Sequence, residues 1–163
     1  MSGILTLNAG SSSMKFGLYH ATEEPEELLQ GEVDDIGDST RLILETPHER
    51  RTTAVHAPTQ QDALSAVMDA LEPFVDGLPV IGVGHRIVHG GPDFTRSTEL
   101  TPEVLQALSA LAPLAPLHQP HNLAGVAAAQ AAFPGRELGA LFDLLDQGQE
   151  LLRLVGYLAA FMA

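Results

Sequence analysis

The sequence predicts an α/β protein in which a mixed sheet is flanked by helices. The first half of the chain contains several short extended segments in succession, separated by turn residues. From Thr59 onward the apolar residues recur with helical spacing, and helical segments then alternate with strands. Of the 163 residues, 45% are hydrophobic and 18% are charged, which is sufficient for a buried core. We therefore expect one domain, or one lobe of a larger protein.

The extended segments come first. An apolar run at 4–7 and an alternating run at 15–20 enclose a turn of small residues, and this order predicts a β-hairpin. Further short strands are expected at 27–33, 41–45 and 52–56. Turn residues separate the first two of these strands: Asp34, Asp35, Gly37 and Asp38.

Three helices are expected in the second half. Thr59 is a predicted N-cap with Asp62 three residues later. The segment 101–103 (TPE) combines a capping hydroxyl, a proline and an acid, and it predicts the start of the second helix. Asn122 is expected to cap a third, alanine-rich helix that ends near Phe133. The apolar face of the first helix comprises Ala63, Leu64, Val67, Met68 and Leu71.

The turn of the predicted hairpin has the composition of a phosphate site. Gly10 and the serines Ser11 to Ser13 allow backbone N–H groups to approach an anion closely, and Lys15 adds a positive charge. A P-loop is excluded, because the second glycine and the Lys-Ser/Thr pair of that motif are missing. The hairpin tip, including Ser11, Ser13 and Lys15, is therefore a candidate phosphate-binding site.

Arg86 is a second candidate for binding an anion. A buried strand at 80–83 leads into His85 and Arg86, so Arg86 is expected just past the strand at the edge of the sheet. A guanidinium can form two parallel hydrogen bonds with a carboxylate or a phosphate. The alternative is a surface ion pair, because the chain contains 21 acidic residues.

Asp143 follows a last short strand, predicted at 138–142. A carboxylate at the C-terminal end of a strand is well placed for catalysis in an α/β sheet, and it can hold a magnesium-bound water. The alternative interpretation is a helix N-cap.

The histidines His85, His89 and His118 do not predict a metal centre. A His-x3-His spacing on a segment that passes from strand to loop is poor chelating geometry, and the chain contains no cysteine. They are interpreted as hydrogen-bonded structural histidines, and His118 is the one expected to contact a phosphate.

Three blocks, in this order, resemble the acetate kinase family, which includes acetate and propionate kinases. They are 4–19 (ILTLNAGSSSMKFGLY), 84–91 (GHRIVHGG) and 115–123 (APLHQPHNL), and the resemblance runs from about Ile4 to Asp143. It implies the ribonuclease-H-like lobe of the actin-like ATPase fold. It also implies phosphoryl transfer between ATP and acetate, with Mg²⁺ as cofactor.

The resemblance assigns roles to individual residues. It assigns Arg86 to the acyl substrate and the transferring phosphoryl group, and Asp143 to catalysis. It places Val88 and Leu117 in an apolar pocket for the methyl group of the substrate. It matches Asn8 to a residue that positions magnesium.

The composition excludes several classes of partner. The net charge of −13 disfavours nucleic-acid binding, and the absence of cysteine excludes a disulfide framework or a thiolate metal site. No signal-like segment is found at the N-terminus, and the apolar stretch at 151–163 is too short to span a bilayer. We expect a cytoplasmic protein with small-molecule substrates.

Beyond Asp143 the sequence departs from the family. We expect residues 1–143 to form an N-terminal acetate-kinase-like lobe and 144–163 to be a divergent tail, with the second lobe absent. The interpretations are a truncated acetate kinase, a non-catalytic remnant that binds phosphate or acyl phosphate, or a propionate or butyrate kinase. A homodimer like that of the family stays open for a chain of this length.

Overall fold

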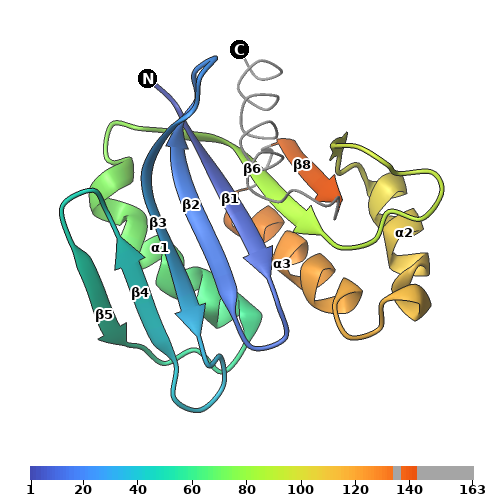
Figure 1. The fold of residues 1–163 in the computed structure, drawn as a ribbon, viewed down its shortest axis with the longest axis horizontal. Coiled ribbons are helices and arrows are strands. Elements are labelled where there is room, and N and C mark those ends of the chain that lie inside the picture. Colours follow the sequence, from blue (N-terminus) through green and yellow to red (C-terminus); the bar gives the residue numbers. More distant parts are fainter. Residues whose placement is uncertain (134–136, 143–163) are drawn as a thin grey trace.

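The computed structural model describes residues 1–133 and 137–142, and it places the strands of these residues in one mixed sheet (Figure 1). The strand order across the sheet is β5-β4-β3-β2-β1-β6-β8-β7. In chain order the strands are β1 (Gly3–Ala9), β2 (Met14–His20), β3 (Glu26–Asp34), β4 (Arg41–Glu45), β5 (Arg50–Ala54), β6 (Val80–Ile87), β7 (Thr98–Glu99) and β8 (Glu137–Phe142).

The sheet changes from antiparallel to parallel pairing at β1. Strands β1 to β5 form an antiparallel meander, and β1, β6 and β8 run parallel to one another. Because β1 and β6 are parallel neighbours, their carboxyl ends lie at the same edge of the sheet. This edge also holds the turn between β1 and β2, because that turn joins the two strands directly.

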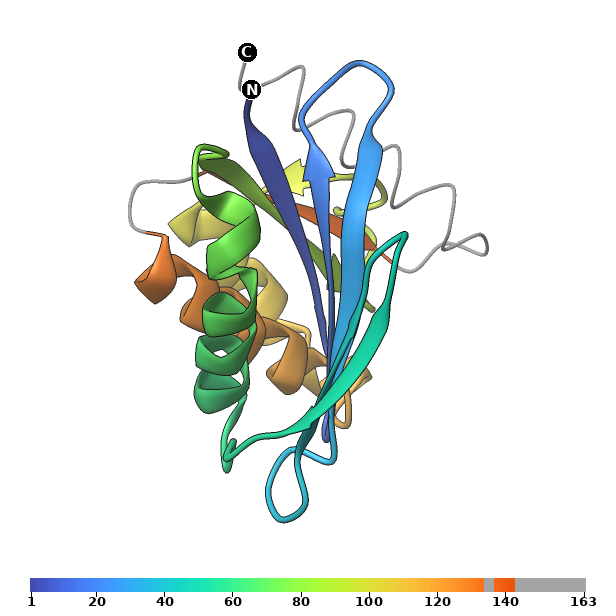
Figure 2. The same cartoon turned by 90° about the vertical axis from the view of Figure 1, so that its left-hand side faces the viewer.

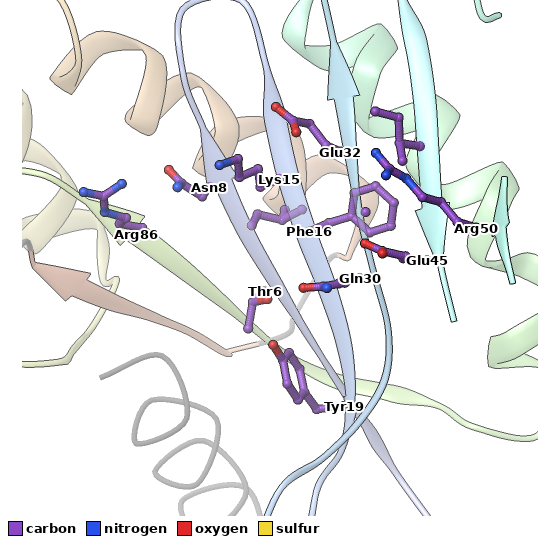
Figure 3. Close-up of a pocket in the computed structure, with 13 residues that line it drawn as sticks. Thr6, Asn8, Lys15, Phe16, Tyr19, Gln30, Glu32, Glu45, Arg50 and Arg86 are labelled. Carbon is purple, nitrogen blue, oxygen red and sulfur yellow. The ribbon is translucent and has the colours of Figure 1, made fainter. Parts of the chain in front are cut away.

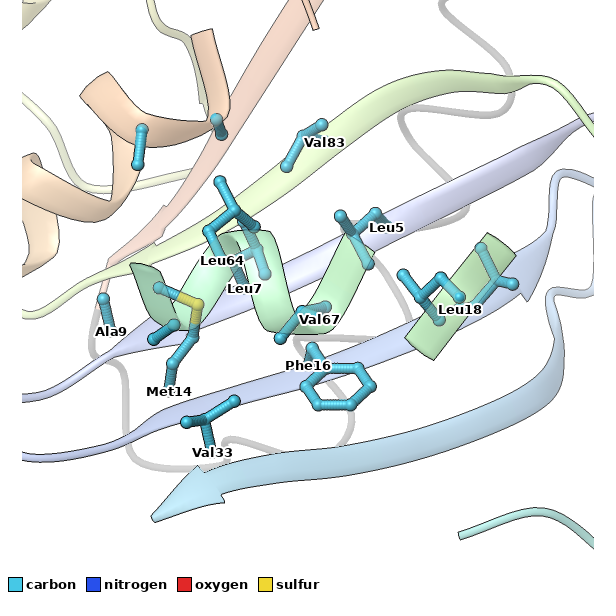
Figure 4. Close-up of a cluster of buried hydrophobic side chains, with 14 of the residues drawn as sticks. Leu5, Leu7, Ala9, Met14, Phe16, Leu18, Val33, Leu64, Val67 and Val83 are labelled. Atoms are coloured by element: carbon cyan, nitrogen blue, oxygen red, sulfur yellow. The ribbon is translucent and has the colours of Figure 1, made fainter. Parts of the chain in front are cut away.

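Helices cover one face of the sheet. Figures 1 and 2 show α1 (Gln60–Val75) and α3 (Gln119–Ala132) on the same side, and α2 (Pro102–Ala110) lies beside α3. The core fills the space between these helices and the sheet (Figure 4), and it includes Leu5, Leu7, Ala9, Met14, Phe16, Leu18, Leu64, Val67 and Val83. Side chains alternate between the two faces of a strand, so the residues between these core positions point to the other face.

Two helix starts are confirmed in detail. The side chain of Thr59 accepts a hydrogen bond from the Asp62 N–H (3.2 Å), and the Asp62 carboxylate accepts one from the Thr59 N–H (3.1 Å), which completes a capping box. Thr101 caps α2 by accepting a hydrogen bond from the Val104 N–H (3.2 Å), with Pro102 in the first turn.

Three expectations about elements are wrong. Helix α3 begins at Gln119 with His118 as its N-cap, so Asn122 lies one turn inside the helix and does not cap it. Strand β6 continues to Ile87, so Arg86 lies within the strand and not past its end. Strand β5 occupies Arg50–Ala54, two residues earlier than expected, because it pairs with β4 from Glu45↔Arg50 to Arg41↔Ala54.

Candidate functional site

The hairpin turn between β1 and β2 is held in place from several sides. Within the turn, the Gly10 N–H donates a hydrogen bond to the Ser13 carbonyl (2.8 Å). From the segment after β3, the Ile36 N–H donates one to the Ser12 carbonyl (2.9 Å). Side-chain amides anchor the start of the turn: Gln60 donates to the Gly10 carbonyl (2.5 Å) and Asn122 donates to the Ala9 carbonyl (2.6 Å). A tip that is fixed in this way can present its hydroxyls to a ligand without ordering the loop first.

The serines of this turn remain accessible. Ser11 and Ser12 are exposed and Ser13 is half-buried. The antiparallel pairing of β1 with β2 confirms the predicted hairpin. The assignment of Ser11 and Ser13 to phosphate stays a prediction.

The strand register aligns three of the predicted site residues on the face of the sheet opposite α1 and α3. Asn8 pairs with Lys15 across β1 and β2, and Leu7 pairs with His85 across β1 and β6. Because Leu7 and His85 point to the helix side, their neighbours Asn8 and Arg86 point to the other side. Figure 3 shows Arg86, Asn8 and Lys15 in one row on adjacent strands.

These three residues line one end of a pocket of about 350 Å³. Its wall continues across β3 to β5, where Glu32 is paired with Lys15 in the register and Glu45 is paired with Arg50. The pocket is thus cationic on the β1–β2–β6 side and mixed in charge on the other side. The residues that line the pocket are Thr6, Leu7, Asn8, Lys15, Phe16, Tyr19, Gln30, Gly31, Glu32, Ile43, Glu45, Arg50 and Arg86 (Figure 3).

Tyr19 forms part of this pocket because Gly17 leaves room for its ring. A Cβ on Gly17 would lie 2.8 Å from the Tyr19 ring carbon Cε2 and 3.0 Å from Thr6 Oγ1. The Tyr19 hydroxyl donates a hydrogen bond to Glu27 (3.4 Å). Burial, together with the Glu27 charge, raises the pKa of Tyr19 to about 12, so its hydroxyl stays protonated at neutral pH.

The segment after β6 reaches the start of α3 through two buried side-chain amides. The Val88 N–H donates a hydrogen bond to Asn122 Oδ1 (3.1 Å). Gln119 donates to the carbonyls of His89 (2.9 Å) and Leu108 (3.1 Å), and its own Oε1 has no hydrogen-bond partner. These bonds fix the loop that carries Val88 against the N-terminal end of α3.

The residues assigned to the acyl group lie close to this helix start but differ in burial. Val88 is half-buried, whereas Leu117 is 74% exposed and His118 is exposed. A pocket for a methyl group would need further apolar side chains over Leu117, so the pocket stays a prediction. His118 is the N-cap of α3, and its carbonyl accepts a hydrogen bond from the Asn122 N–H (3.0 Å).

Two predicted features, Asp143 and the divergent tail at 144–163, lie outside the described residues. The backbone of β8 pairs with β6 from Gly82↔Glu137 to Ile87↔Phe142. Within residues 1–133 and 137–142, no group of three or more His, Asp or Glu side chains is arranged to hold a metal ion. In the same part of the chain, no helix is long and apolar enough to cross a membrane.

His85 lies in the core beneath this site. It is 2% exposed, its Nε2 has no hydrogen-bond partner, and burial lowers its pKa from 6.5 to about 3. The imidazole is therefore neutral at physiological pH, and its Nε2 lacks the hydrogen bond expected of a structural histidine. His89 does form such a bond, because its Nδ1 accepts a hydrogen bond from the Gly91 N–H (2.9 Å).

The buried position of His85 predicts that the protein loses stability in acid. Between pH 6.5 and pH 3 the unfolded chain binds a proton at His85 and the folded chain does not, so the free energy of unfolding falls as the pH drops through this window. Between pH 7 and pH 5 this one group accounts for about 2 kcal/mol. Urea unfolding at these two pH values is expected to show a smaller loss in His85→Leu than in the wild type.

The exposed His48 provides a control for this substitution, because His48→Leu makes the same chemical change at the surface. Equal losses of stability in the wild type and His85→Leu would show that His85 binds its proton in the folded state.

Sequence reasoning missed two functional contacts, those of Gln60 and Asn122 with the hairpin. Their partners lie 50 and 113 residues away in the chain, at Gly10 and Ala9. A glutamine at a helix start and an asparagine in a helix carry no local signal for such bonds.

Comparison with known proteins places this arrangement in a family. The model of the Acetokinase family matches residues 3–145. The acetate kinase of Deinococcus radiodurans is 40% identical over 140 residues, which are 85% of this chain and 35% of that protein. The propionate kinase of Escherichia coli O6:H1 is 38% identical over 140 residues, with 86% of this chain and 34% of that protein covered.

Solved structures give the same result. The acetate kinase of Porphyromonas gingivalis superposes with a TM-score of 0.80 at 36% identity, and a propionate kinase from Francisella tularensis does so with a TM-score of 0.80 at 30% identity. Each match covers 88% of this chain and 37% of the solved chain, so the 163 residues span little more than a third of these relatives. The mixed sheet with flanking helices is thus confirmed as a lobe of the actin-like ATPase fold. By the match to its family model over most of its length, the chain belongs to the acetokinase family.

Proposed function

We propose that residues 1–143 form the N-terminal lobe of an acetate kinase, which transfers a phosphoryl group between ATP and acetate. The observation that carries the proposal is the row of Asn8, Lys15 and Arg86 on adjacent strands, next to the fixed hairpin tip. An amide, an ammonium and a guanidinium at one sheet edge form an anion-binding surface in a chain whose net charge is −13.

The chemistry of these groups suits phosphoryl transfer, which requires alignment and charge neutralisation more than covalent participation. Arg86 can grip the acyl carboxylate or the transferring phosphoryl group with two parallel hydrogen bonds. Lys15 and the hydroxyls of Ser11 and Ser13 would bind phosphate oxygens of ATP. Asp143 is proposed as the catalytic carboxylate that orients the attacking acetate.

Magnesium fits this surface through oxygen ligands. Mg²⁺ keeps several waters and needs few protein ligands, and the side-chain oxygen of Asn8 together with the serine hydroxyls would hold such a hydrated ion. When bound, the ion would neutralise charge on the phosphates of ATP. Because ATP is the proposed second substrate, we also propose that the protein works in the cytoplasm.

Propionate is a second candidate for the acyl substrate. The matches to propionate kinases support it, at 38% identity in sequence and a TM-score of 0.80 in structure. Val88, Leu117 and His118 are proposed to surround the acyl group, and the depth of the apolar pocket at Val88 and Leu117 would decide between a methyl and an ethyl group.

Phosphate binding tests the proposal on the 163-residue chain itself. If the surface binds anions, inorganic phosphate should raise the melting temperature by mass action. Arg86→Ala is expected to remove most of this rise, because a charge-assisted hydrogen bond contributes about 1.5–3 kcal/mol. Lys15→Ala should remove less, since lysine acts as a point charge.

Sulfate and chloride at matched ionic strength control for general salt effects. Arg96→Ala provides a matched variant, because Arg96 is an exposed arginine outside the pocket lining. Equal phosphate-induced rises in the wild type and Arg86→Ala would refute the proposed role of Arg86.

A further inference from the structure

Asn122 connects the ends of β1 and β6, the strands that carry Asn8 and Arg86 of the proposed anion-binding surface. Its side chain is 4% exposed, and both ends of its amide are hydrogen-bonded to backbone. Nδ2 donates to the carbonyl of Ala9 at the end of β1 (2.6 Å), and Oδ1 accepts from the N–H of Val88 just after β6 (3.1 Å). The helix that carries Asn122 packs on both strands.

These bonds lie where the regular pairing of β1 with β6 stops. The parallel register between the two strands runs from Gly3↔Val80 to Leu7↔His85. Ala9 and Val88 lie beyond the last of these pairs, and the amide of Asn122 takes the place of a peptide group between them. A primary amide has one acceptor and a two-hydrogen donor, so it can satisfy both strand ends at once.

The bridged strand ends lie close in sequence to the groups on the opposite face. Asn8 directly precedes Ala9 and pairs with Lys15, whereas Arg86 lies two residues before Val88. A shift of either strand end would therefore change the distance between Arg86 and the Asn8–Lys15 pair. In catalysis, a misplacement of about 1 Å can lower the rate about 100-fold.

Neighbouring amides do not provide this connection. Gln60 bonds to Gly10 on the hairpin side alone, and Gln119 bonds to His89 and Leu108 on the other side alone. Asn122, by contrast, bonds to the end of β1 at Ala9 and to Val88 just after β6.

We infer that Asn122 is a positioning residue, which holds the β1 end and the β6 end at the separation that lets Arg86 and Lys15 bind one phosphate group together. The inference rests on the proposed function, because it concerns the same anion-binding surface. Asn122 would thus act on the two strand ends, whereas a helix cap would act on the start of α3 alone.

The test is a double-mutant cycle with inorganic phosphate as the probe, at a temperature where every variant is folded by circular dichroism. Asn122→Ala is expected to weaken phosphate binding roughly tenfold, in the range of a lost charge-assisted hydrogen bond. In Arg86→Ala the same substitution should have little further effect, because the contact that it positions is already gone. Additive losses would overturn the inference.

Val67→Ala is the matched control for lost stability. Val67 is fully buried in α1 and lies outside the pocket lining, so its truncation destabilises the fold and leaves both bonds of Asn122 in place. The phosphate affinity of Val67→Ala is expected to stay within about twofold of that of the wild type, because distant sites without shared partners act independently. A loss as large as that in Asn122→Ala would show that general destabilisation explains both.

The spacing can also be measured without phosphate. Nuclear Overhauser contacts between the amide protons of residues 8–10 and 86–88 are expected to change in Asn122→Ala. Unchanged contacts would overturn the inference, whereas a wild-type chain with these contacts and no phosphate binding would refute the proposed function alone.

Discussion

The 163-residue chain, assayed by itself with ATP, Mg²⁺ and acetate, is expected to form no acetyl phosphate above background. The proposed anion-binding groups all come from one sheet edge and the helix start beside it, whereas the chain covers 35% of the Deinococcus radiodurans acetate kinase. A transferring phosphoryl group needs charge stabilisation around all of its equatorial oxygens. Each missing donor typically lowers kcat by about 10²–10³-fold.

Hydroxamate detection of acetyl phosphate measures this directly, and the Deinococcus radiodurans enzyme serves as the positive control. Acetyl phosphate formation by the 163 residues that is abolished in Arg86→Ala would contradict the prediction, and it would show that one lobe suffices for turnover. Phosphate binding without turnover would agree both with the lobe of an acetate kinase and with a binding remnant.

The second large effect is expected at Gly125, the one glycine of α3, which lies against β1. A Cβ at this position would lie 2.7 Å from the Cβ of Ala9. Gly125→Val is therefore expected to push the helix away from the strand and to lower the free energy of unfolding by about 3 kcal/mol. Phosphate binding should be lost as well, because the Ala9 carbonyl is held by Asn122 of the same helix.

Urea unfolding and the phosphate-induced rise in melting temperature measure the two parts of this prediction. Ala124→Val is the matched control, because Ala124 is the exposed neighbour in the same helix and loses only helix propensity, about 0.5 kcal/mol. If Gly125→Val is as stable as Ala124→Val, the close approach of α3 to β1 does not limit the residue at this position.

Local signals determined much of what the sequence predicts correctly. The hairpin follows from alternation on either side of a small-residue turn, and the starts of α1 and α2 follow from Thr59 with Asp62 and from Thr101 with Pro102. In each case the interacting groups lie within a few residues of one another, so the pattern contains the information that forms the structure.

The site depended more on pairing between distant segments. Sequence reasoning placed Arg86 after a strand because the apolar run ends at Val83, but the ladders with β1 and β8 extend β6 to Ile87. That extension fixes which face Arg86 occupies and sets it beside Asn8 and Lys15. Strand neighbours that far apart in the chain leave no trace in local periodicity.

Asn122 shows the limit of local reasoning. By itself the sequence determined the small-residue turn of the hairpin, the family resemblance and the positions of most helices and strands. Only the tertiary structure decided that Asn122 bonds to Ala9 and Val88 and does not cap its helix. The physical reason is that the ends of β1 and β6 leave one backbone carbonyl and one backbone N–H without a partner in the strand ladder. The buried amide of Asn122 satisfies both groups.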